Sequence, residues 1–353
     1  MSPDTSFTAS PDPEDDSTAA SVSAGGGRGL VVRDSTAHEA AVDVCEFCGA
    51  TSVAVRYDFG PHQILRCRSC TFMWLTPRPS EAELKEIYSV DYFRNPDFFD
   101  ADNDTLYGYY DYFSERFIKQ LDHQRLVDRL ADARPVSGAS RRRFLDIGCG
   151  LGYLLDVAHD RGFDVEGVEY NPAAADWIAS KYQFPVFCGD FMAYEGGRFD
   201  AVAMLDVIEH LPQPFDALDK VAAVTNPGGV FVVSTMDSDS LVSRLIGKRL
   251  EDFRRTREHL YFFNRRTLGA ALERAGFDVL RIESYGLTIQ LDFLAARMRL
   301  AFPVIGALFE KLVRWSGLSR RRFRFDPRTK MIVYARRRGG AEGGAPDAPA
   351  EAR

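Results

Sequence analysis

The feature that most constrains the fold is a glycine-rich turn at residues 148–152, set between an apolar run and a helical pattern. The run FLDI at 144–147 predicts a strand buried on both faces, because it is short, largely apolar and bounded by glycine. The residues after the turn have the spacing of an amphipathic helix as far as Gly162, and residues 164–169 predict a second strand. A strand, a glycine turn, a helix and a strand in this order are typical of a nucleotide site on a parallel α/β sheet.

The spacing of acids and glycines indicates which nucleotide the turn binds. A dinucleotide turn reads G-x-G-x-x-G and faces a pyrophosphate, whereas the third glycine here, Gly152, comes one residue early. Asp146 lies just before the turn, where a carboxylate suits a cationic amino group and not a phosphate. Glu169 ends the second strand, where an acid accepts hydrogen bonds from ribose hydroxyls. The pattern therefore predicts S-adenosylmethionine (SAM), which has an amino group, a ribose and an adenine but no phosphate.

The same stretch resembles motif I of the class I SAM-dependent methyltransferases, and the resemblance continues over residues 141–338. FPVFCGDF, FDAVAMLDVIEHL and NPGGVFVVSTM follow as a third, fourth and fifth strand, and two more strands end with TKMIVYARRR. The resemblance implies an α/β fold, a Rossmann-like domain of seven strands with a core similar to ubiquinone-type O-methyltransferases. In this family the acid at Asp190 contacts the adenine amino group, and the apolar side chain at Phe191 packs against the ring. The implied SAM site comprises Asp146, Gly148, Gly150, Gly152, Glu169, Asp190, Phe191 and Asp206.

Four cysteines form two C-x-x-C pairs: Cys45, Cys48, Cys67 and Cys70. The two-residue spacing lets both thiolates of a pair bind one ion, so the pattern predicts a structural Zn²⁺ ribbon over residues 43–80. A closed four-thiolate site has no position for water, and its expected role is to fold a segment too small for its own core. A redox dithiol pair is the alternative. Cys149 and Cys188 are expected to be small buried residues.

An aromatic-rich segment, expected to be helical, follows at residues 81–134. Eleven tyrosines and phenylalanines fall within residues 88–117. The ribbon, the Thr-Pro-Arg-Pro turn at 76–79 and this segment resemble the front part of bacterial sugar- and glycan-pathway methyltransferases, including deoxysugar C-methyltransferases. We expect most of these rings to pack the joint between the ribbon and the SAM-binding domain, while some tyrosines can line a ligand site.

The candidate catalytic residues follow the fourth strand and the fifth. Methyl transfer to a hydroxyl or an acidic carbon needs a base close to the nucleophile, at the sheet edge where ligands bind. His210 is the predicted base, with Glu209 orienting it or contacting the substrate, and related O- and C-methyltransferases have a Glu-His pair at this place. His259, in the segment REHLYFF, is the second candidate. A capping role for Glu209 and His210 in the helix beside Pro212 is the alternative.

An insertion at about residues 287–325 separates the sixth strand from the seventh. Its apolar residues fall roughly on one helical face interrupted by Pro303, and a basic cluster follows at 320–324. These apolar residues are Leu294, Met298, Ala301, Ile305, Leu308 and Leu312. The insertion is interpreted as a lid over the acceptor site or a dimer contact. The alternative is peripheral contact with an anionic membrane surface, since apolar helices that end in arginines can lie on such a surface.

The two ends of the chain are expected to be disordered, at residues 1–42 and 339–353, because they contain almost no large apolar side chains. Of the total net charge of −7, residues 1–44 carry −6 and residues 341–353 carry −2, which leaves the middle near +1. The acidity therefore belongs to the tails and says little about a partner. The sequence has no run of 18 apolar residues and no signal-peptide pattern, so a cytoplasmic location without disulfides is expected.

The expected function is methyl transfer from SAM to a hydroxyl or carbon of a small molecule, sugar or lipid-linked glycan, and the oligomeric state stays open. One alternative is an RNA methyltransferase whose ribbon binds nucleic acid. Residues 45–70 hold three arginines against two acids, which is too little positive charge for phosphate contacts. Another alternative is a scaffold that binds SAM without catalysis. The complete set of glycines, acids and histidines argues against it.

Overall fold

The computed structural model describes residues 44–88, 90–93, 99–100, 105–106, 116–133 and 141–339. The chain divides into two units, Met1–Val42 and Asp43–Arg353, and every described residue lies in the second. The disordered arm predicted at 1–42 lies outside the described residues, as do all but the first residue of the tail predicted at 339–353 and much of the aromatic-rich segment.

The core is a seven-stranded sheet in the order β12-β15-β10-β9-β6-β7-β8. Its strands are β6 (Arg143–Ile147), β7 (Asp164–Glu169), β8 (Val186–Cys188), β9 (Phe199–Leu205), β10 (Thr225–Met236), β12 (Phe277–Ser284) and β15 (Lys330–Arg337). The strands from β8 to β10 are parallel, whereas β15 runs antiparallel to both of its neighbours. The predicted α/β, Rossmann-like sheet of seven strands is confirmed.

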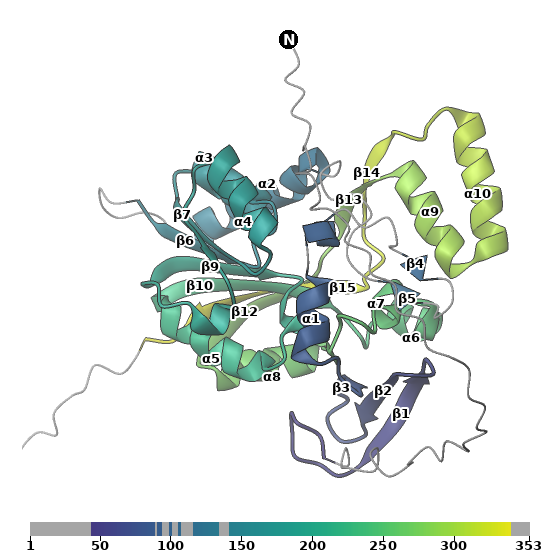
Figure 1. Ribbon diagram of the computed structural model, residues 1–353, viewed down its shortest axis with the longest axis horizontal. Helices are drawn as coiled ribbons and strands as arrows, with labels where there is room; N and C mark the ends of the chain where they lie inside the picture. The colour runs from purple at the N-terminus through teal and green to yellow at the C-terminus, as the bar shows by residue number, and fades with distance from the viewer. Residues whose placement is uncertain are drawn as a thin grey trace, which may run out of the picture. The chain divides into compact units, whose positions relative to one another are not determined.

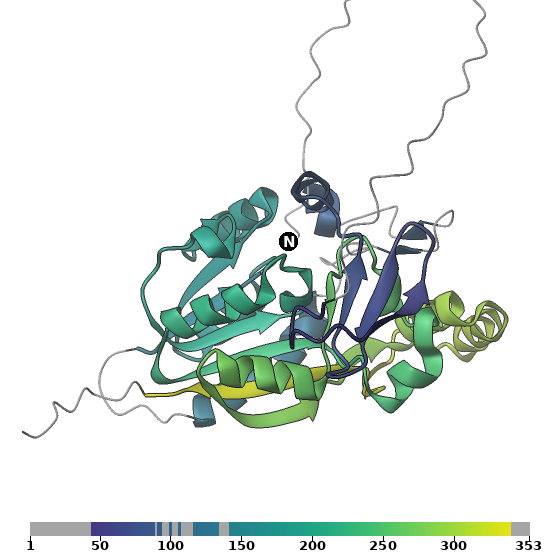
Figure 2. The same ribbon diagram turned by 90° about the horizontal axis from the view of Figure 1, so that it is seen from below.

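Helices cover both faces of this sheet. They are α2 (Arg116–Ala133), α3 (Tyr153–Asp160), α4 (Pro172–Lys181), α5 (Pro214–Val224) and α8 (Arg265–Arg274). Figure 1 shows the first three above the sheet and the last two below it, and Figure 2 shows the lower helices in front. Leu126, Val127 and Leu130 of α2 share a core cluster with α3 and the strands, so α2 packs as part of this domain.

The order of the strands places the site. The chain moves outward from β6 to β7 and β8, and then returns to build β9 and β10 on the other side of β6. The turns after β6 and β9 therefore diverge at a topological switch point, where open α/β sheets bind ligands. Gly148 after β6 and Val207 after β9 lie in contact there: a Cβ atom on Gly148 would fall 2.4 Å from Cγ2 of Val207.

The cysteine-containing segment forms an antiparallel sheet of β1 (Val53–Asp58), β2 (Gln63–Cys67) and β3 (Met73–Thr76). Its fourth strand, β11 (Tyr261–Phe262), comes from much later in the sequence and pairs with β3. Helix α1 (Glu81–Ile87) follows, and a capping box between Ser80 and Glu83 begins it. The short elements η1 (Val90–Phe93), β4 (Phe99–Asp100) and β5 (Thr105–Leu106) come between α1 and α2.

The insertion is a helical hairpin on a two-stranded base. Strands β13 (Leu287–Gln290) and β14 (Arg322–Phe325) pair with each other and enclose α9 (Leu291–Ala301) and α10 (Pro303–Ser316). Pro303, which interrupts the apolar face in the sequence, begins a second helix that packs against the first. Consequently Ile305, Leu308 and Leu312 are exposed, and their side chains do not continue the face of α9.

The remaining described elements connect the strands. They are η2 (Phe191–Ala193), η3 (Ile208–His210), α6 (Leu241–Ile246), η4 (Gly247–Arg249) and α7 (Glu251–Arg254). Within the described part of the chain, every helix is too short or too polar to cross a lipid bilayer.

Candidate active site

The glycine turn after β6 has the backbone that its sequence predicts. Gly148, Gly150 and Gly152 have φ values of 71°, 55° and 76°, in the left-handed region where a side chain is strained. The turn ends at Gly152, the N-cap of α3. The three glycines therefore let the backbone turn sharply and leave the N-terminus of α3 facing the carboxyl edge of the sheet.

Two buried acids flank this turn. Asp146 is 3% exposed and Glu169 is 6% exposed. Glu169 accepts hydrogen bonds from the backbone N–H of Gly150 at 2.7 Å and of Asn171 at 2.8 Å. Burial raises the pKa of Glu169 to about 7, although these two hydrogen bonds act in the opposite direction. Burial and the negative charge of Glu169 raise the pKa of Asp146 well above its usual range. A cationic ligand would lower the energy of both carboxylates, so this pair fits the positively charged SAM.

The predicted adenine contacts differ in exposure. Phe191 is 4% exposed in η2, whereas Asp190 is exposed and caps that turn by accepting a hydrogen bond from the N–H of Met192 at 2.8 Å. Both follow β8, two strands away from β6 at the same edge of the sheet. Their roles toward adenine remain predictions.

Asp206, also predicted to bind the cofactor, is engaged by neighbours within the protein. It has a φ of 54° at the end of β9, accepts a hydrogen bond from Ser234 Oγ at 3.1 Å and pairs with Lys330 Nζ at 2.5 Å. Burial alone would raise the pKa of Asp206, but the charge and the hydrogen bond of Lys330 lower it below its usual value. A contact of Asp206 with SAM remains a prediction.

The structure brings the three predicted catalytic residues together. The donor atoms of Glu209, His210 and His259 all lie within 4.8 Å of one another. The two imidazole rings are 4.7 Å apart between centroids and nearly perpendicular. Oε2 of Glu209 and Nδ1 of His259 are buried and have no hydrogen-bond partner among the described residues. Buried polar atoms without partners are costly, so this cluster suits a polar group of a ligand or a metal ion.

The hydrogen bond of His210 determines which of its nitrogens can act as a base. Nδ1 of His210 lies 3.0 Å from the carbonyl oxygen of Glu258. Because a carbonyl only accepts, Nδ1 carries the proton in the neutral ring and Nε2 keeps its lone pair. Burial lowers the pKa of His210, and burial also lowers that of His259 far below the usual value. Both rings are therefore neutral at pH 7, the state that a base requires.

Glu209 is in the opposite protonation state from an ordinary surface acid. Glu209 is 1% exposed, and burial together with the charge of Asp206 raises the pKa of its carboxyl group to about 8. At pH 7 this group is largely protonated and can donate a hydrogen bond as well as accept one. The helix-capping alternative for Glu209 and His210 receives no support, because the following helix, α5, has Gln213 as its N-cap residue and no side-chain cap hydrogen bond.

Sequence reasoning missed the buried ion pair that holds this cluster. Arg255 donates hydrogen bonds to Glu258 at 2.5 Å and to Glu251 at 2.9 Å, and Glu258 is fully buried. The pair fixes the segment whose carbonyl group accepts the proton of His210. The sequence offers only a weak signal for it, namely a charge-dense run immediately before His259.

The ribbon holds the same segment from the other side. The backbone N–H of Leu75 in β3 donates to the carbonyl of Leu260, and the N–H of Leu260 donates to the carbonyl of Glu209 at 2.8 Å. One residue thus joins the ribbon to the turn that carries Glu209 and His210. Phe72 adds side-chain packing between the two parts, because its ring contacts those of Phe215 and Tyr261 at 5.8 Å.

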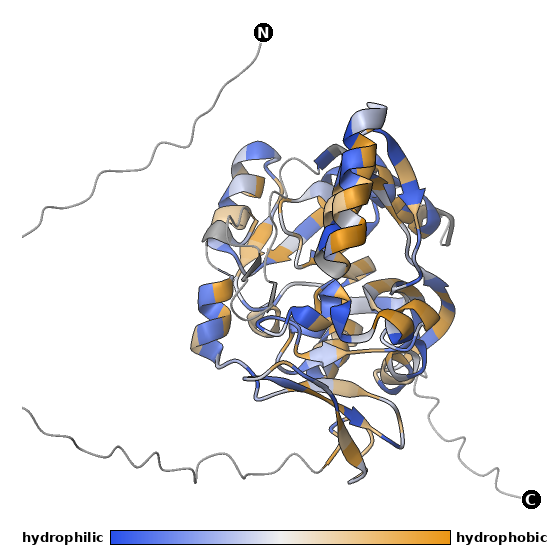
Figure 3. Ribbon diagram, turned by 90° about the vertical axis from the view of Figure 1, so that its right-hand side faces the viewer, coloured by the Kyte–Doolittle hydropathy of each residue, from blue (hydrophilic) through white to orange (hydrophobic). Residues whose placement is uncertain are grey.

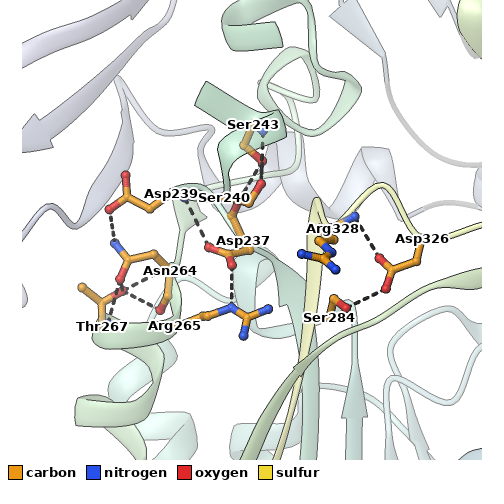
Figure 4. Close-up of polar contacts among 10 residues, drawn as sticks. All are labelled: Asp237, Asp239, Ser240, Ser243, Asn264, Arg265, Thr267, Ser284, Asp326 and Arg328. Carbon is orange, nitrogen blue, oxygen red and sulfur yellow. Dashed lines mark hydrogen bonds and ion pairs between the residues drawn. The ribbon is translucent and has the colours of Figure 1, made fainter. Parts of the chain in front are cut away.

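A polar network continues this attachment at the start of α8. Figure 4 shows Arg265 donating to Asp237 and Asn264 reaching Asp239. Asn264 also donates to Thr71 Oγ1 at 3.0 Å, and Arg66 of the ribbon pairs with Asp239 at 2.9 Å. The ribbon is therefore fastened to the ends of both β10 and β11.

The four predicted metal-binding cysteines converge at one end of the ribbon. Their sulfur atoms lie within 4.8 Å of one another, with Cys45 and Cys70 3.5 Å apart and Cys48 and Cys67 3.7 Å apart. Four thiolates each ~2.3 Å from a central Zn²⁺ would lie ~3.8 Å apart, so the donor set fits this ion. All four are free thiols, as are the two remaining cysteines.

The other two cysteines have different surroundings. Cys149 is buried, as expected, and lies beside Gly167 of β7, where a Cβ atom would be 2.7 Å from its sulfur. The expectation that Cys188 is buried is wrong: it is exposed, because it ends β8, the outermost strand of the sheet. That edge also borders a cavity of about 510 Å³ lined by Glu166, Phe187 and Tyr194, to which none of the predicted site residues contributes.

Comparison with known families gives matches over part of the chain. Residues 112–282 match the family model described as a methyltransferase domain. The ubiquinone biosynthesis O-methyltransferase of Alkalilimnicola ehrlichii is 34% identical over 113 residues, which cover 30% of this chain and 46% of that protein. The mitochondrial ubiquinone biosynthesis O-methyltransferase of Arabidopsis thaliana is 33% identical over 116 residues, which cover 30% of this chain and 35% of that protein. The chain spans less than half of the length of these two curated relatives.

Solved structures with a similar arrangement have low sequence identity. The magnesium protoporphyrin IX methyltransferase ChlM of Synechocystis PCC 6803 with bound SAH has a TM-score of 0.42 at 18% identity, covering 64% of this chain and 87% of that one. A SAM-dependent methyltransferase from Archaeoglobus fulgidus has a TM-score of 0.42 at 23% identity, covering 64% and 99%.

Proposed function

We propose, from the premise that residues 112–282 form a methyltransferase domain of the class I SAM-dependent type, that this chain transfers the methyl group of SAM to a hydroxyl oxygen of a small molecule. The family match and the curated relatives support the resemblance to SAM-dependent methyltransferases over residues 112–282. The curated relatives carry O-methyltransferase names, and this supports oxygen as the acceptor atom. A sugar or lipid-linked glycan hydroxyl is the narrower proposal, which rests on the resemblance of the front part of the chain.

The observation that carries the proposal is the Glu209, His210 and His259 cluster at the carboxyl edge of the sheet. Nε2 of His210 takes the proton of the acceptor hydroxyl, while Nδ1 stays bonded to the carbonyl of Glu258. The protonated carboxyl of Glu209 and the ring of His259 orient the acceptor oxygen. Removal of the proton raises the nucleophilicity of this oxygen at the moment it attacks.

SAM, when bound, supplies a methyl group activated by a sulfonium. Asp146 fits its amino group and Glu169 its ribose hydroxyls, since both carboxylates are buried at the glycine turn and a cation would offset their repulsion. Gly148, Gly150 and Gly152 keep side chains out of the space above the sheet edge. Phe191 and Asp190 are proposed for the adenine. Asp206, which directly follows β9 next to β6, is proposed as a further contact of SAM.

The test supplies the purified chain and methyl-labelled SAM to an extract of the native cells. Label is then counted in RNA, protein, lipid-glycan and small-molecule fractions. Label in small molecules, sugars or lipid-glycan supports the proposal and identifies the class. Label in RNA would overturn the acceptor class, and SAM binding without any label would favour the scaffold alternative.

The role of His210 is tested with the acceptor fraction found in this way. His210→Ala should leave SAM binding unchanged and lower turnover by about 10²- to 10⁴-fold, the usual contribution of a general base. The matched control is His159→Ala, because His159 is exposed on α3 and outside the cluster. Unchanged turnover in His210→Ala would remove the base assignment.

Zinc in the ribbon is proposed on the convergence of the four cysteine sulfurs. When bound, the ion would fold the ribbon, whose three strands enclose little core of their own. Metal analysis of the purified chain should find about one zinc per chain, and Cys45→Ser should abolish it. A wild-type chain that holds no zinc and keeps its unfolding midpoint in chelator would remove the proposal.

A further inference from the structure

Helix α10 presents its apolar side to solvent. Its exposed residues are Val304 at 85%, Ile305 at 60%, Leu308 at 71%, Leu312 at 58% and Trp315 at 85%. At about 100° per residue these five fall within one arc of about 100°. Figure 3 shows the protein from the side on which α10 lies, and orange segments recur along this helix. An apolar stripe of this size on a helix surface marks a place where something binds.

The opposite side of α10 packs against α9. Gly306 and Val313, half a turn away from the stripe, are buried. Gly306 lies so close to α9 that a Cβ atom on it would be 2.2 Å from Cα of Arg299. The side of α10 that carries Gly306 and Val313 therefore packs against α9. This packing leaves the apolar stripe on the opposite side exposed.

Positive charge borders the stripe. Residues 291–325 contain eight arginines and lysines against two acids. Lys311 lies beside the stripe on the helix, and the exposed run Arg320–Arg322 comes just after the end of α10. Glu310 lies on the other side of the helix, where it pairs with Arg299 and Arg314. The border of the stripe thus attracts anions.

We propose that α10 and Arg320–Arg322 form a docking surface for a membrane rich in anionic lipid. An apolar helix face bordered by lysine and arginine inserts at the boundary between headgroups and acyl chains, and tryptophan is favoured at that depth. The helix has 14 residues and is about 21 Å long, so it lies along the surface. This inference goes beyond the proposed function and does not depend on it.

The charges favour a membrane over a second copy of the chain. A two-fold contact through the stripe would bring the basic borders of two copies together, and like charges in an interface are costly. Anionic headgroups instead neutralise them. The hairpin is also joined to the candidate site, because Arg297 of α9 pairs with Glu251, which accepts a hydrogen bond from Arg255. Docking would thus hold the segment before His259 close to the bilayer.

The test is flotation of the full chain with lipid vesicles. The wild type should bind vesicles of phosphatidylcholine with about one-third phosphatidylglycerol, and should bind pure phosphatidylcholine much more weakly. R320A/R321A/R322A should weaken binding to the anionic vesicles by roughly a hundredfold, because each basic residue near the surface contributes about a factor of five. High salt should have a similar effect on the wild type.

The apolar half of the surface is tested by L308E/W315E. These side chains are exposed, so the unfolding midpoint should not change, while vesicle binding should be lost. The control is L280E, at a leucine that is 45% exposed on β12. Equal binding of L308E/W315E and wild type would overturn the inference. So would a wild-type dimer that binds no vesicles and that L308E/W315E converts to a monomer.

Discussion

The packing of Phe72 allows the attachment of the ribbon to the domain of the seven-stranded sheet to be measured. Its side chain is 0% exposed and contacts five aromatic rings at centroid distances of 5.3 to 6.2 Å. Two of these rings, Phe47 and Trp74, belong to the ribbon segment; the other three, Phe215, Tyr261 and Phe263, belong to the domain. Phe72→Ala therefore removes the ring that joins the two groups.

The expected loss follows from these contacts. Truncation of a buried phenylalanine to alanine lowers the free energy of unfolding by about 3–5 kcal/mol. The five ring pairs place Phe72→Ala in the upper half of that range, because aromatic pairs contribute beyond their buried area. A domain is stable by about 5–15 kcal/mol, so the loss is a large fraction of the total.

Urea unfolding in zinc-containing buffer measures this loss, and the control is Val55→Ala. Val55 lies in the same ribbon but is 53% exposed, so its truncation should change stability by less than about 0.5 kcal/mol. Amide hydrogen exchange should also accelerate at Leu260 in Phe72→Ala and stay slow in β9. A loss below about 1 kcal/mol would refute the reasoning, because it would mean that the ring is not packed between the two parts.

Three further outcomes are expected at the glycine turn and the base. Glu169→Ala should weaken SAM binding by at least about tenfold, since a hydrogen bond to a charged group contributes about 1.5–3 kcal/mol. Calorimetry measures this affinity. Glu169→Gln keeps one acceptor oxygen, so its loss of SAM affinity should be smaller. Gly148→Ala should lower the unfolding midpoint more than Gly228→Ala. Both glycines have φ near 70°, but only at Gly148 would an added Cβ atom collide with a neighbour, Val207. Equal unfolding midpoints for the two variants would contradict this steric explanation. The methyl-transfer rate should stay level between about pH 7.5 and 6.5 and fall at lower pH, because burial lowers the pKa of His210 beneath its usual value of about 6.5 and protonation inactivates the base. The rate should also fall as the pH rises through about 8, because the Glu209 carboxyl then loses the proton with which it orients the acceptor. A loss of rate on the acid side with a midpoint above 7 would contradict the assignment of His210.

Much of the α/β domain could be predicted from local sequence. The strand ending at Ile147, the glycine turn and Glu169 follow from apolar runs and glycine positions that act over a few residues. The meeting of His210 with His259 was harder to foresee, because it depends on β11 pairing with a distant ribbon strand. Strand pairing over long separations leaves almost no trace in the pattern of either partner.

The pairing of Lys330 with Asp206 could have been predicted from the strand topology of this fold. The seventh strand of this fold is antiparallel to the fifth, so its first residues lie beside the last residues of β10: Lys330 pairs with Met236. That register places Lys330 at the same edge as Asp206, its partner. The pair Arg255 and Glu258 offers no comparable rule, because burial of an ion pair depends on tertiary packing. Pro303 marks the boundary between α9 and α10 in the sequence, because proline cannot continue a helix but suits its first turn. The packing of the two helices against each other depends on tertiary contacts that helical spacing does not show.

The hydrogen bonds that link the ribbon to His210 allow the four cysteines to affect the geometry of the proposed base. Leu260 donates to the carbonyl of Glu209 and accepts from the N–H of Leu75, and the neighbouring carbonyl of Glu258 fixes the proton of His210. Without the ribbon, the N–H of Leu75 would be lost as a partner and β11 would be an unpaired edge two residues long, too short to hold its position. Glu258 and His259, which directly precede β11, would then move with this strand. A metal bound at Cys45 and its partners would therefore stabilise the geometry of a base that it never touches.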